Sequence, residues 1–524
     1  MSRLKRTKSS FKRDEEGRVI LGTAKDMAAW VELGFEEQDK RKSDDIPFYK
    51  HFIDLRNCVL YISYPIEGKG EPASKIFNLC HMVGIVPGID NLEGDSDYLY
   101  EVKLDIHLEG SVLFGNFFHY VKFDGMVKMD DATVIGTSSC FKCLFLSFVY
   151  MQGIHITGRS DYEQCEFRKG LVLTDSKSDL FHFNNCTIDE RLLLSSVNLE
   201  NHHNEGYHQS IEITNSSVEN LSISSVNTNG LPIYMGDSKI NGMHVDKVML
   251  DCTLCFNSCV LDGIITFVKV EESTRNKFKE VKFHGCELKG QYHIENSDME
   301  KFSFNFCNVC ESGRLRLSQC IVEGFVAGCS TVSGQMDVTE NEISEICLEG
   351  TCIQGFLNFQ SNIIKKYSDR QTLCLLKNEA RKVNDDVAAM QLYAKEMRLL
   401  LADNSISLWD KVSLWLTRLF SSFGENWGQA LLVTFVLSVV LTLAMLGFGS
   451  TKYGFDLTGD FIGIKFYIST LLDSINVFSI PLFRDTIEEY RLNVWGQILY
   501  FVIKLVVAYG TYQFVVAFRK YVRR

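Results

Sequence analysis

Two long apolar stretches lie near the C-terminus of the chain. Residues 430–448 carry no charge, and residues 494–518 carry one, Lys504, near the middle. At about 1.5 Å per residue, a helix of either stretch could cross the hydrocarbon core of a bilayer, which is about 30 Å thick. The pattern therefore predicts two membrane-spanning helices, over 428–448 and 494–518, within a membrane domain over 425–524.

A different pattern, in which apolar and polar positions alternate with period two, runs through residues 105–362. This period indicates strands. The strand-like units recur about every 9–13 residues, so two of them would make a coil of roughly 20–23 residues. Strands this short cannot bury an apolar face alone and must stack coil on coil. The pattern predicts a right-handed β-helix, and cysteines that recur once per coil are expected to be buried in an inward ladder: Cys286, Cys307, Cys329 and Cys352.

The N-terminal part of the chain has a weaker pattern. Residues 1–20 are basic and are expected to form a disordered tail. Residues 21–104 are expected to form an α/β cap region, with a helix over 22–42 and short strand-like runs at 58–64 and 98–106. This mixed pattern indicates no sharper role for the cap region.

The segment between the β-helix and the membrane domain, residues 363–424, predicts a helical linker. Apolar residues at three- and four-residue steps predict an amphipathic helix over 375–404. A second helical stretch, 407–423, lies directly before the first span. Its aromatic residues suit a membrane–water interface: Trp409, Trp415 and Phe420.

Composition and charge narrow the protein class. A chain of 524 residues is too long for one core, which predicts several domains. A net charge of −12 argues against a surface that binds nucleic acid over its whole area, although a local basic patch stays open. The chain has 17 cysteines and no export signal at its N-terminus, which indicates reduced, buried thiols.

The charges beside the two spans predict their orientation. Lys411 and Arg418 precede the first span, and basic residues also follow the second span. Acidic residues outnumber basic ones in the loop 449–493. Because basic flanks stay on the cytoplasmic side, both termini are expected in the cytoplasm and the loop 449–493 outside.

Three segments carry a resemblance to a known family: DDVAAMQLYAKEM at 385–397, FGENWGQAL at 423–431 and FVVAFRKYVRR at 514–524. Together with the solenoid pattern before them, they resemble bacterial pentapeptide-repeat proteins that end in a two-span ion-channel domain. The resemblance covers 285–524 well and 120–285 loosely. It implies a tetrameric pore in the bacterial inner membrane.

Two features depart from the pattern of that family. The solenoid lacks regular A-[DN]-L-x-x pentads, and the segment aligned with a potassium filter, 469–481, contains no TVGYG. Potassium filters of that kind depend on stacked backbone carbonyls from TVGYG loops. The second departure therefore puts potassium selectivity in doubt.

A polar stripe in the second span marks the candidate pore lining. On a helix these residues share one face: Gln497, Phe501, Lys504, Ala508 and Thr511. A lysine at that depth is costly in lipid, so it indicates a face turned to water or to protein. The alternative is a lysine neutralised by an acidic partner such as Asp473 at a helix contact. Gly510 could act as a hinge, although glycine is common in membrane helices.

The segment between the spans could return into the membrane. Residues 464–475 would then form a pore helix and would place three polar residues at a constriction: Asp473, Ser474 and Asn476. The alternative is an amphipathic helix that lies on the outer surface, because irregular backbone at membrane depth needs protein or water around it.

No catalytic or metal-binding pattern emerges from the sequence. The chain lacks HExxH, P-loop, GxSxG and dinucleotide-binding motifs, so neither an enzyme nor a cofactor is expected. Residues i and i+3 of a strand point to opposite faces, which makes CxxC pairs in strands poor zinc sites unless a turn intervenes. No metal is therefore expected at the three CxxC pairs: Cys140/Cys143, Cys252/Cys255 and Cys307/Cys310.

Together these features predict an oligomeric ion channel or pore subunit of the membrane that is gated by a cytosolic β-helix. Modules with a cytosolic sensor on a small pore look like effectors of bacterial anti-phage defence that depolarise the inner membrane, and a nucleotide or oligonucleotide ligand of the cytosolic region would fit that role. The expected partners are membrane lipid and further copies of the chain in a tetramer. The alternative is a membrane-anchored β-solenoid scaffold without conductance.

Overall fold

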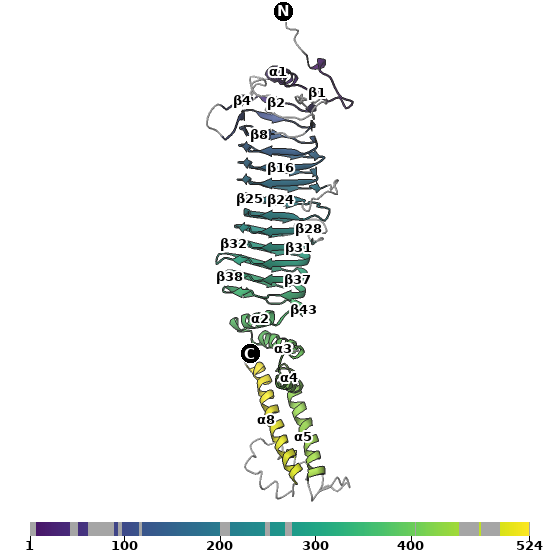
Figure 1. The fold of residues 1–524 in the computed structure, drawn as a ribbon, viewed down its shortest axis with the longest axis vertical. Coiled ribbons are helices and arrows are strands. Elements are labelled where there is room, and N and C mark those ends of the chain that lie inside the picture. Colours follow the sequence, from purple (N-terminus) through teal and green to yellow (C-terminus); the bar gives the residue numbers. More distant parts are fainter. Residues whose placement is uncertain are drawn as a thin grey trace, which may run out of the picture. The chain divides into compact units, whose positions relative to one another are not determined.

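The computed structural model describes residues 7–41, 51–60, 89–92, 97–114, 118–199, 210–246, 252–267, 275–403, 405–449, 471–472 and 493–522. The chain divides into two compact units, Met1–Lys366 and Tyr367–Arg524. The first unit consists mainly of strands and the second mainly of helices (Figure 1).

The first unit is a β-solenoid of about 11 turns, in which each coil stacks on the one before it (Figure 1). Strands of successive coils pair in parallel. For example, β14 (Val149–Gln152) pairs with β18 (Leu171–Thr174) residue for residue. Stacked parallel coils bury an apolar face that no single short strand could bury. The prediction of a β-solenoid is confirmed, and its right-handed sense stays a prediction.

Within its described residues, the solenoid has three sheets that form its sides. The seven-stranded sheet contains β1 (Val19–Leu21), β3 (Cys58–Leu60), β7 (Val112–Phe114), β11 (Thr133–Ile135), β15 (His155–Ile156), β19 (Lys177–Ser178) and β23 (Asn198–Leu199). The 12-stranded sheet contains β8 (Phe118–His119), β12 (Ser138–Phe141), β16 (Arg159–Glu163), β20 (Leu180–Asn184), β24 (Ile211–Thr214), β26 (Ile233–Gly236), β28 (Cys252–Asn257), β31 (Asn276–His284), β34 (Ser297–Asn305), β37 (Ile321–Gly328), β40 (Glu342–Cys347) and β43 (Ile363–Tyr367).

The 24-stranded sheet covers the remaining sides. Besides β14 and β18 it contains β2 (Phe52–Asp54), β4 (Ile89–Asn91), β5 (Tyr100–Val102), β6 (Asp105–His107), β9 (Val121–Phe123), β10 (Val127–Lys128), β13 (Leu144–Phe145), β17 (Glu166–Phe167), β21 (Thr187–Ile188), β22 (Leu192–Ser195), β25 (Ser217–Ser224), β27 (Lys239–Asp246), β29 (Val260–Leu261), β30 (Ile264–Phe267), β32 (Glu287–Leu288), β33 (Gln291–Glu295), β35 (Asn308–Val309), β36 (Arg314–Ser318), β38 (Thr331–Val332), β39 (Gln335–Thr339), β41 (Cys352–Ile353) and β42 (Phe356–Asn358).

One corner of the coil repeats along the solenoid. A residue with left-handed backbone stands at this corner, as at Lys142 (φ 49°) and Asn185 (φ 54°), and the next residue, Cys143 or Cys186, is buried. The Cys143 thiol donates to the carbonyl oxygen of Phe118 in the preceding coil, at 3.2 Å. The same inward position holds small residues in other coils: Cys165, Ser216, Ser238, Cys259, Cys286, Cys307 and Ser330.

Two of the four cysteines that were predicted to be buried are exposed. Cys286 and Cys307 are buried, whereas Cys329 and Cys352 are exposed. Cys329 is itself the left-handed corner residue (φ 50°), and Ser330 takes the inward position. Cys352 pairs with the residue that follows Ser330, so it also lies one position beyond the ladder. Because side chains alternate between faces, a slip of one residue turns a side chain outward, and the prediction for these two cysteines was wrong.

Aromatic rings stack along the interior of the solenoid. The rings of Phe123 and Phe145 are 4.8 Å apart and nearly parallel, and Phe167 continues the stack at the same spacing. This distance equals the spacing between neighbouring strands, about 4.7–4.9 Å. Equivalent positions of successive coils therefore place rings in direct contact, and each such pair contributes about 0.5–1.5 kcal/mol beyond its buried area.

The N-terminal region joins the solenoid. Strand β1 pairs in parallel with β3, and β2 pairs in parallel with β6, so the parallel stack extends before residue 105. Helix α1 (Ala24–Arg41) occupies the stretch predicted to be helical. The stretch expected to be a disordered tail contains a short 3₁₀ helix, η1 (Lys8–Ser10), and β1. A strand of three residues shows too little alternation of apolar and polar positions. The sequence alone therefore could not reveal that these strands belong to the solenoid and not to a separate cap region.

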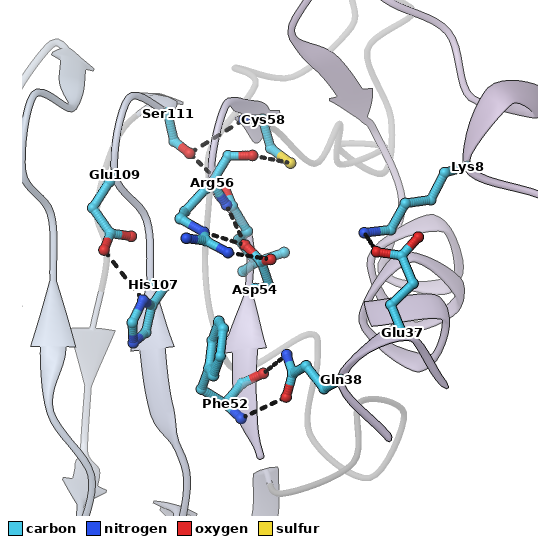
Figure 2. Close-up of polar contacts among 11 residues, drawn as sticks. Lys8, Glu37, Gln38, Phe52, Asp54, Arg56, Cys58, His107, Glu109 and Ser111 are labelled. Atoms are coloured by element: carbon cyan, nitrogen blue, oxygen red, sulfur yellow. Dashed lines mark hydrogen bonds and ion pairs between the residues drawn. The ribbon is translucent and has the colours of Figure 1, made fainter. Parts of the chain in front are cut away.

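Helix α1 covers the first coil, and Figure 2 shows the polar contacts there. The side-chain amide of Gln38 donates to the carbonyl oxygen of Phe52 at 3.0 Å and accepts from its backbone N–H at 3.2 Å. Gln38 thus makes the hydrogen bonds that a further strand would make to β2. Edge strands left open are prone to pair with other chains, so this contact closes the N-terminal end of the solenoid.

The second unit contains five helices within its described residues: α2 (Arg370–Lys382), α3 (Asp386–Ala402), α4 (Leu408–Ser421), α5 (Trp427–Gly449) and α8 (Val494–Val522). Helices α5 and α8 occupy the two stretches predicted to be spans. The single helix expected over 375–404 is two helices. The chain turns at Asn384 (φ 60°), and Asp385 caps the start of α3 by accepting from the N–H of Ala388. Asparagine tolerates left-handed backbone and aspartate is a favoured N-cap, so the Asn-Asp pair was a readable break signal.

Candidate functional site

The candidate site is the hairpin of α5 and α8, which lie side by side (Figure 1). Both helices are long and apolar enough to cross a membrane, over Trp427–Met445 and Val494–Arg519. Only 22% and 28% of their most apolar stretches are buried. A core helix of a soluble protein would be mostly buried, and exposed apolar surface of this extent marks a membrane or protein interface. The hairpin therefore supports association with a membrane.

One face of α8 packs toward α5. The buried residues on this face are spaced by three and four: Gly496, Tyr500, Ile503, Val507 and Gly510. A side chain at Gly510 would overlap the side chain of Thr434 on α5. Glycine lets two helix backbones approach closely within a membrane. The structure thus gives Gly510 a packing role, and its role as a hinge stays a prediction.

The predicted pore stripe lies on a different face of α8. Phe501, Ala508 and Thr511 are exposed, and Gln497 and Lys504 are partly exposed. The Lys504 ammonium nitrogen lies 5.3 Å from the centroid of the Tyr500 ring, within the range of a cation–π contact. Phe501, Ala508 and Thr511 are thus accessible on the surface of the hairpin, whereas Gln497 and Lys504 are partly covered and make contacts of their own.

A groove of about 300 Å³ follows the seam between the two helices. Thr511 of the stripe lines it, together with Leu431, Thr434, Phe435, Ser438, Gly510 and Phe514. The hydroxyls of Thr434 and Ser438 donate to backbone carbonyls one turn earlier in α5, at 2.6 and 2.7 Å. These hydroxyls therefore need no other partner, and the groove is mainly apolar.

The three residues expected at a constriction, Asp473, Ser474 and Asn476, lie outside the described residues, as does most of the expected pore helix. The alternative partner for Lys504, Asp473, falls in the same segment. Neither prediction is tested.

Helix α4 is fastened to the C-terminal half of α8. The Thr417 and Tyr509 hydroxyls lie 3.0 Å apart, and the Ser421 hydroxyl donates to the side-chain oxygen of Gln513 at 2.8 Å. Phe420 is buried, and its ring meets that of Tyr509 edge to face at 5.1 Å. Phe420 is therefore a packing residue, in contrast to the interfacial role expected from the sequence.

Helices α2 and α3 share a buried ion pair. Glu396 of α3 accepts hydrogen bonds from Lys377 and, at 3.1 Å, from Arg370. The Glu396 side chain is only 2% exposed. Burial opposes its ionisation, but the hydrogen bonds from Lys377 and Arg370 outweigh this cost and lower its pKa below the usual range. The pair joins the two helices through charges that water reaches poorly.

Two contacts join α3 to the turn between α4 and α5, and this turn also touches α8. Arg398 of α3 forms an ion pair with Glu425, in the turn between α4 and α5. Gly424 in the same turn lies close to Met390 of α3 and Val516 of α8, since a side chain built at Gly424 would meet both. The turn thus touches the helix before the hairpin and the candidate pore helix.

The three CxxC pairs differ in the exposure of their second cysteine. Lys142 makes a turn between Cys140 and Cys143, and both cysteines are buried. In the other two pairs, Cys252/Cys255 and Cys307/Cys310, the first cysteine is buried and the second is partly exposed. Across the described part of the chain, no group of three or more His, Cys, Asp or Glu is placed to hold a metal ion.

Sequence reasoning missed the polar contacts that fasten α4. Gln513 is a polar residue inside an apolar span and lies off the stripe of Gln497, Lys504 and Thr511. That position was the available signal, because a buried amide requires a partner. Its partner, Ser421, could not be identified, because the two residues are far apart in sequence.

No known protein family, curated protein or solved structure matches the chain.

Proposed function

We propose that this chain is the subunit of an oligomeric membrane ion channel, with α8 lining the pore and the β-solenoid controlling it. The observation that carries the proposal is the position of Lys504. It lies in the middle of an apolar span, on one helix face with Gln497 and Thr511, and its side chain is partly exposed. A charge at this depth is favourable only where it faces water or protein, and a water-filled pore between copies would supply that environment.

Several copies are needed for such a pore. A hairpin of two helices cannot enclose a channel, whereas a ring of identical subunits can, and cyclic symmetry is the usual form of such rings. The groove beside Thr511 and the small residues in it would let helices of neighbouring copies approach closely. We propose a tetramer, in line with the resemblance to two-span channel domains.

The linker helices offer a route from the solenoid to the pore. A movement of α3 would act on the turn at Gly424 and Glu425 through Met390 and Arg398. Coupling through packed side chains requires an element with two discrete arrangements. In this proposal that element is the turn between α4 and α5, because it touches both α3 and α8.

The setting of the channel is proposed from the charge pattern and the resemblance. The basic flanks of the spans favour cytoplasmic termini and an outer loop over 449–493. In a bacterial inner membrane, opening of such a pore would depolarise the cell, which is how an anti-phage effector could act. A nucleotide or oligonucleotide bound by the cytosolic region would be a suitable trigger.

The proposal is tested by ion flux from liposomes that contain the purified full chain. We expect Lys504→Glu to shift ion preference toward cations and Lys504→Leu to lower conductance, because the wetting of the pore depends on this charge. Lys279→Glu, an equal charge reversal on the exposed surface of β31, is the matched control and should leave conductance unchanged.

A membrane-anchored scaffold makes a different prediction. In that case Lys504→Leu would improve insertion and no variant would alter a current, because no current flows. Liposomes that hold assembled protein but pass no ions, with or without extracts of infected cells, would favour the scaffold.

A further inference from the structure

Helix α4 has an apolar face that no described part of the chain covers. Its exposed residues include Leu408 at 71%, Trp409 at 79% and Trp415 at 54% of their full surface. Val412 is exposed on the same side. Residues spaced by three, four and seven share one face of a helix, so these side chains form one apolar strip.

The face of α4 turned toward the protein carries two hydroxyl groups beside one buried aromatic ring. Thr417 and Ser421 hydrogen-bond to α8, as described above, and Phe420 packs beside them. A surface helix of a soluble protein shows the reverse arrangement, with its apolar face buried in the core. The reversed arrangement therefore points to an apolar environment outside the protein.

Basic residues border the apolar strip. Lys411 and Arg418 are seven residues apart and lie along the same edge of the helix. Asp410 lies on another side, where it is occupied by hydrogen bonds with Ser407 at the helix N-cap. A helix with tryptophans on an apolar face and basic residues beside it is suited to the headgroup region of a membrane, where anionic lipids attract the basic side chains.

The position of α4 beside the spans fits this environment. Ser422, Phe423 and Gly424 have φ values of 47°, 62° and 86° and turn the chain sharply between α4 and α5. Helix α4 thus lies where α5 begins and α8 ends (Figure 1). This is the end of the hairpin at which the headgroups would be found if α5 and α8 cross a bilayer.

We infer that α4 is a lipid-binding helix that inserts its apolar face into the headgroup region of a membrane containing anionic phospholipid. The inference rests on the membrane location in the proposed function, but not on ion conduction. Because Thr417, Phe420 and Ser421 join α4 to Tyr509 and Gln513 of α8, binding of lipid by α4 would act directly on the candidate pore helix.

The test uses the full chain with Trp427→Phe and Trp495→Phe, reconstituted in phosphatidylcholine vesicles with and without phosphatidylglycerol. Both replaced residues are exposed, whereas Trp30 is buried and contributes a constant background. The remaining emission then reports mainly on Trp409 and Trp415. We expect quenching by phospholipid brominated near the headgroup, little quenching by iodide, and stronger lipid quenching when phosphatidylglycerol is present.

The charges are tested in the same background. Lys411→Glu with Arg418→Glu should lower lipid quenching several-fold in vesicles with phosphatidylglycerol and should raise quenching by iodide. Lys279→Glu on the solenoid is the matched control and should change neither. Ion flux measured in the same vesicles separates the two proposals, because lipid quenching without flux would overturn only the channel.

Two outcomes would overturn the lipid-binding helix. Strong iodide quenching with no lipid quenching would mean that α4 faces water. Protection from both quenchers would mean that another copy of the chain, or another part of it, covers the apolar strip.

Discussion

Each corner of the solenoid depends on two consecutive residues. The first has left-handed backbone, as at Asn185, and the second is small and points inward, as at Cys186. Left-handed backbone costs a residue with a side chain about 1–2 kcal/mol. The cost is offset because the turn lets the next thiol or hydroxyl bond to the coil before it. Cys329 is exposed, whereas the next residue, Ser330, is buried. Exposure thus changes from one residue to the next.

Thiol labelling should separate these positions. We expect Cys329 and Cys352 to react quickly in the native protein, and Cys143, Cys165 and Cys186 to react only after unfolding. Burial also suppresses the reactive thiolate, since it raises the pKa of the Cys320 thiol from 9.0 to about 12, which lowers the thiolate fraction at neutral pH about a thousandfold. Alkylation followed by peptide mass spectrometry measures each site, and equal rates at all sites would contradict the ladder.

At the scale of the element, a few polar contacts decide how helices and strands are held. Gln38 closes the free edge of β2. Glu396 joins α3 to α2 through Lys377 and Arg370. Such contacts are costly to break when only one partner is removed, because the other partner is left buried without a hydrogen bond.

Removal of the Gln38 amide should open the first edge of the solenoid. Gln38→Leu leaves the N–H and C=O of Phe52 without their partner, which we expect to cost about 1–2 kcal/mol. Hydrogen exchange at β2 should speed up, and self-association through the free edge should increase. Gln152→Leu, at an exposed position of β14, is the control and should change neither. Unchanged exchange at β2 in Gln38→Leu would show that α1 alone protects the edge.

Loss of the Glu396 charge should loosen the hairpin of α2 and α3. Glu396→Gln leaves the Lys377 ammonium buried without a counter-charge, at an expected cost of about 3–5 kcal/mol. Faster hydrogen exchange throughout α2 and α3 would report this loss of stability. Replacement of both Lys377 and Glu396 by methionine should restore most of the protection, since no buried charge is then left unpaired and the exposed Arg370 side chain stays solvated by water.

The stabilisation that the Glu396 ion pair provides should decrease as pH falls. The pKa of Glu396 is lower in the folded protein than its usual value of 4.5. The unfolded chain therefore binds the proton first as pH falls, so the stabilisation is complete above about pH 5 and is lost below pH 4.5. Hydrogen exchange of α2 and α3 should accelerate across this acidic window more in the natural protein than in the double methionine variant.

At the scale of the whole molecule, the two units differ in where their apolar side chains lie. The solenoid buries its apolar side chains inside its own coils, whereas α5 and α8 expose theirs. The surface of the solenoid is instead rich in ion pairs between successive coils, such as Arg168–Asp189 and Lys169–Glu190. The solenoid therefore presents charged side chains on its surface, whereas α5 and α8 present apolar ones.

Truncation should separate the part of the chain that dissolves in water from the part that requires detergent. We expect a chain that ends at residue 403, which keeps the solenoid, α2 and α3, to dissolve without detergent, because the exposed apolar faces of α4, α5 and α8 are removed. The full chain should sediment with membranes and require detergent. Fractionation by ultracentrifugation measures both, and a truncated chain in the membrane fraction would contradict the assignment of the membrane-facing surface to the last three helices.

The sequence by itself determined the elements whose signal is local. Period two along 105–362 indicated stacked strands, and two long apolar runs indicated α5 and α8, because a repeat or an uncharged run is visible without any partner. The seven-residue spacing of Gln497, Lys504 and Thr511 likewise placed them on one helix face.

Only the tertiary structure decided which residues meet across long distances. It placed Ser421 against Gln513, Lys377 against Glu396, and Gly510 against Thr434. It also corrected Cys329, because a strand face changes with every residue and small irregularities in coil length cannot be counted from a weak repeat. The outward direction of the apolar face of α4 was decided in the same way, since that direction depends on which side of the helix α8 occupies.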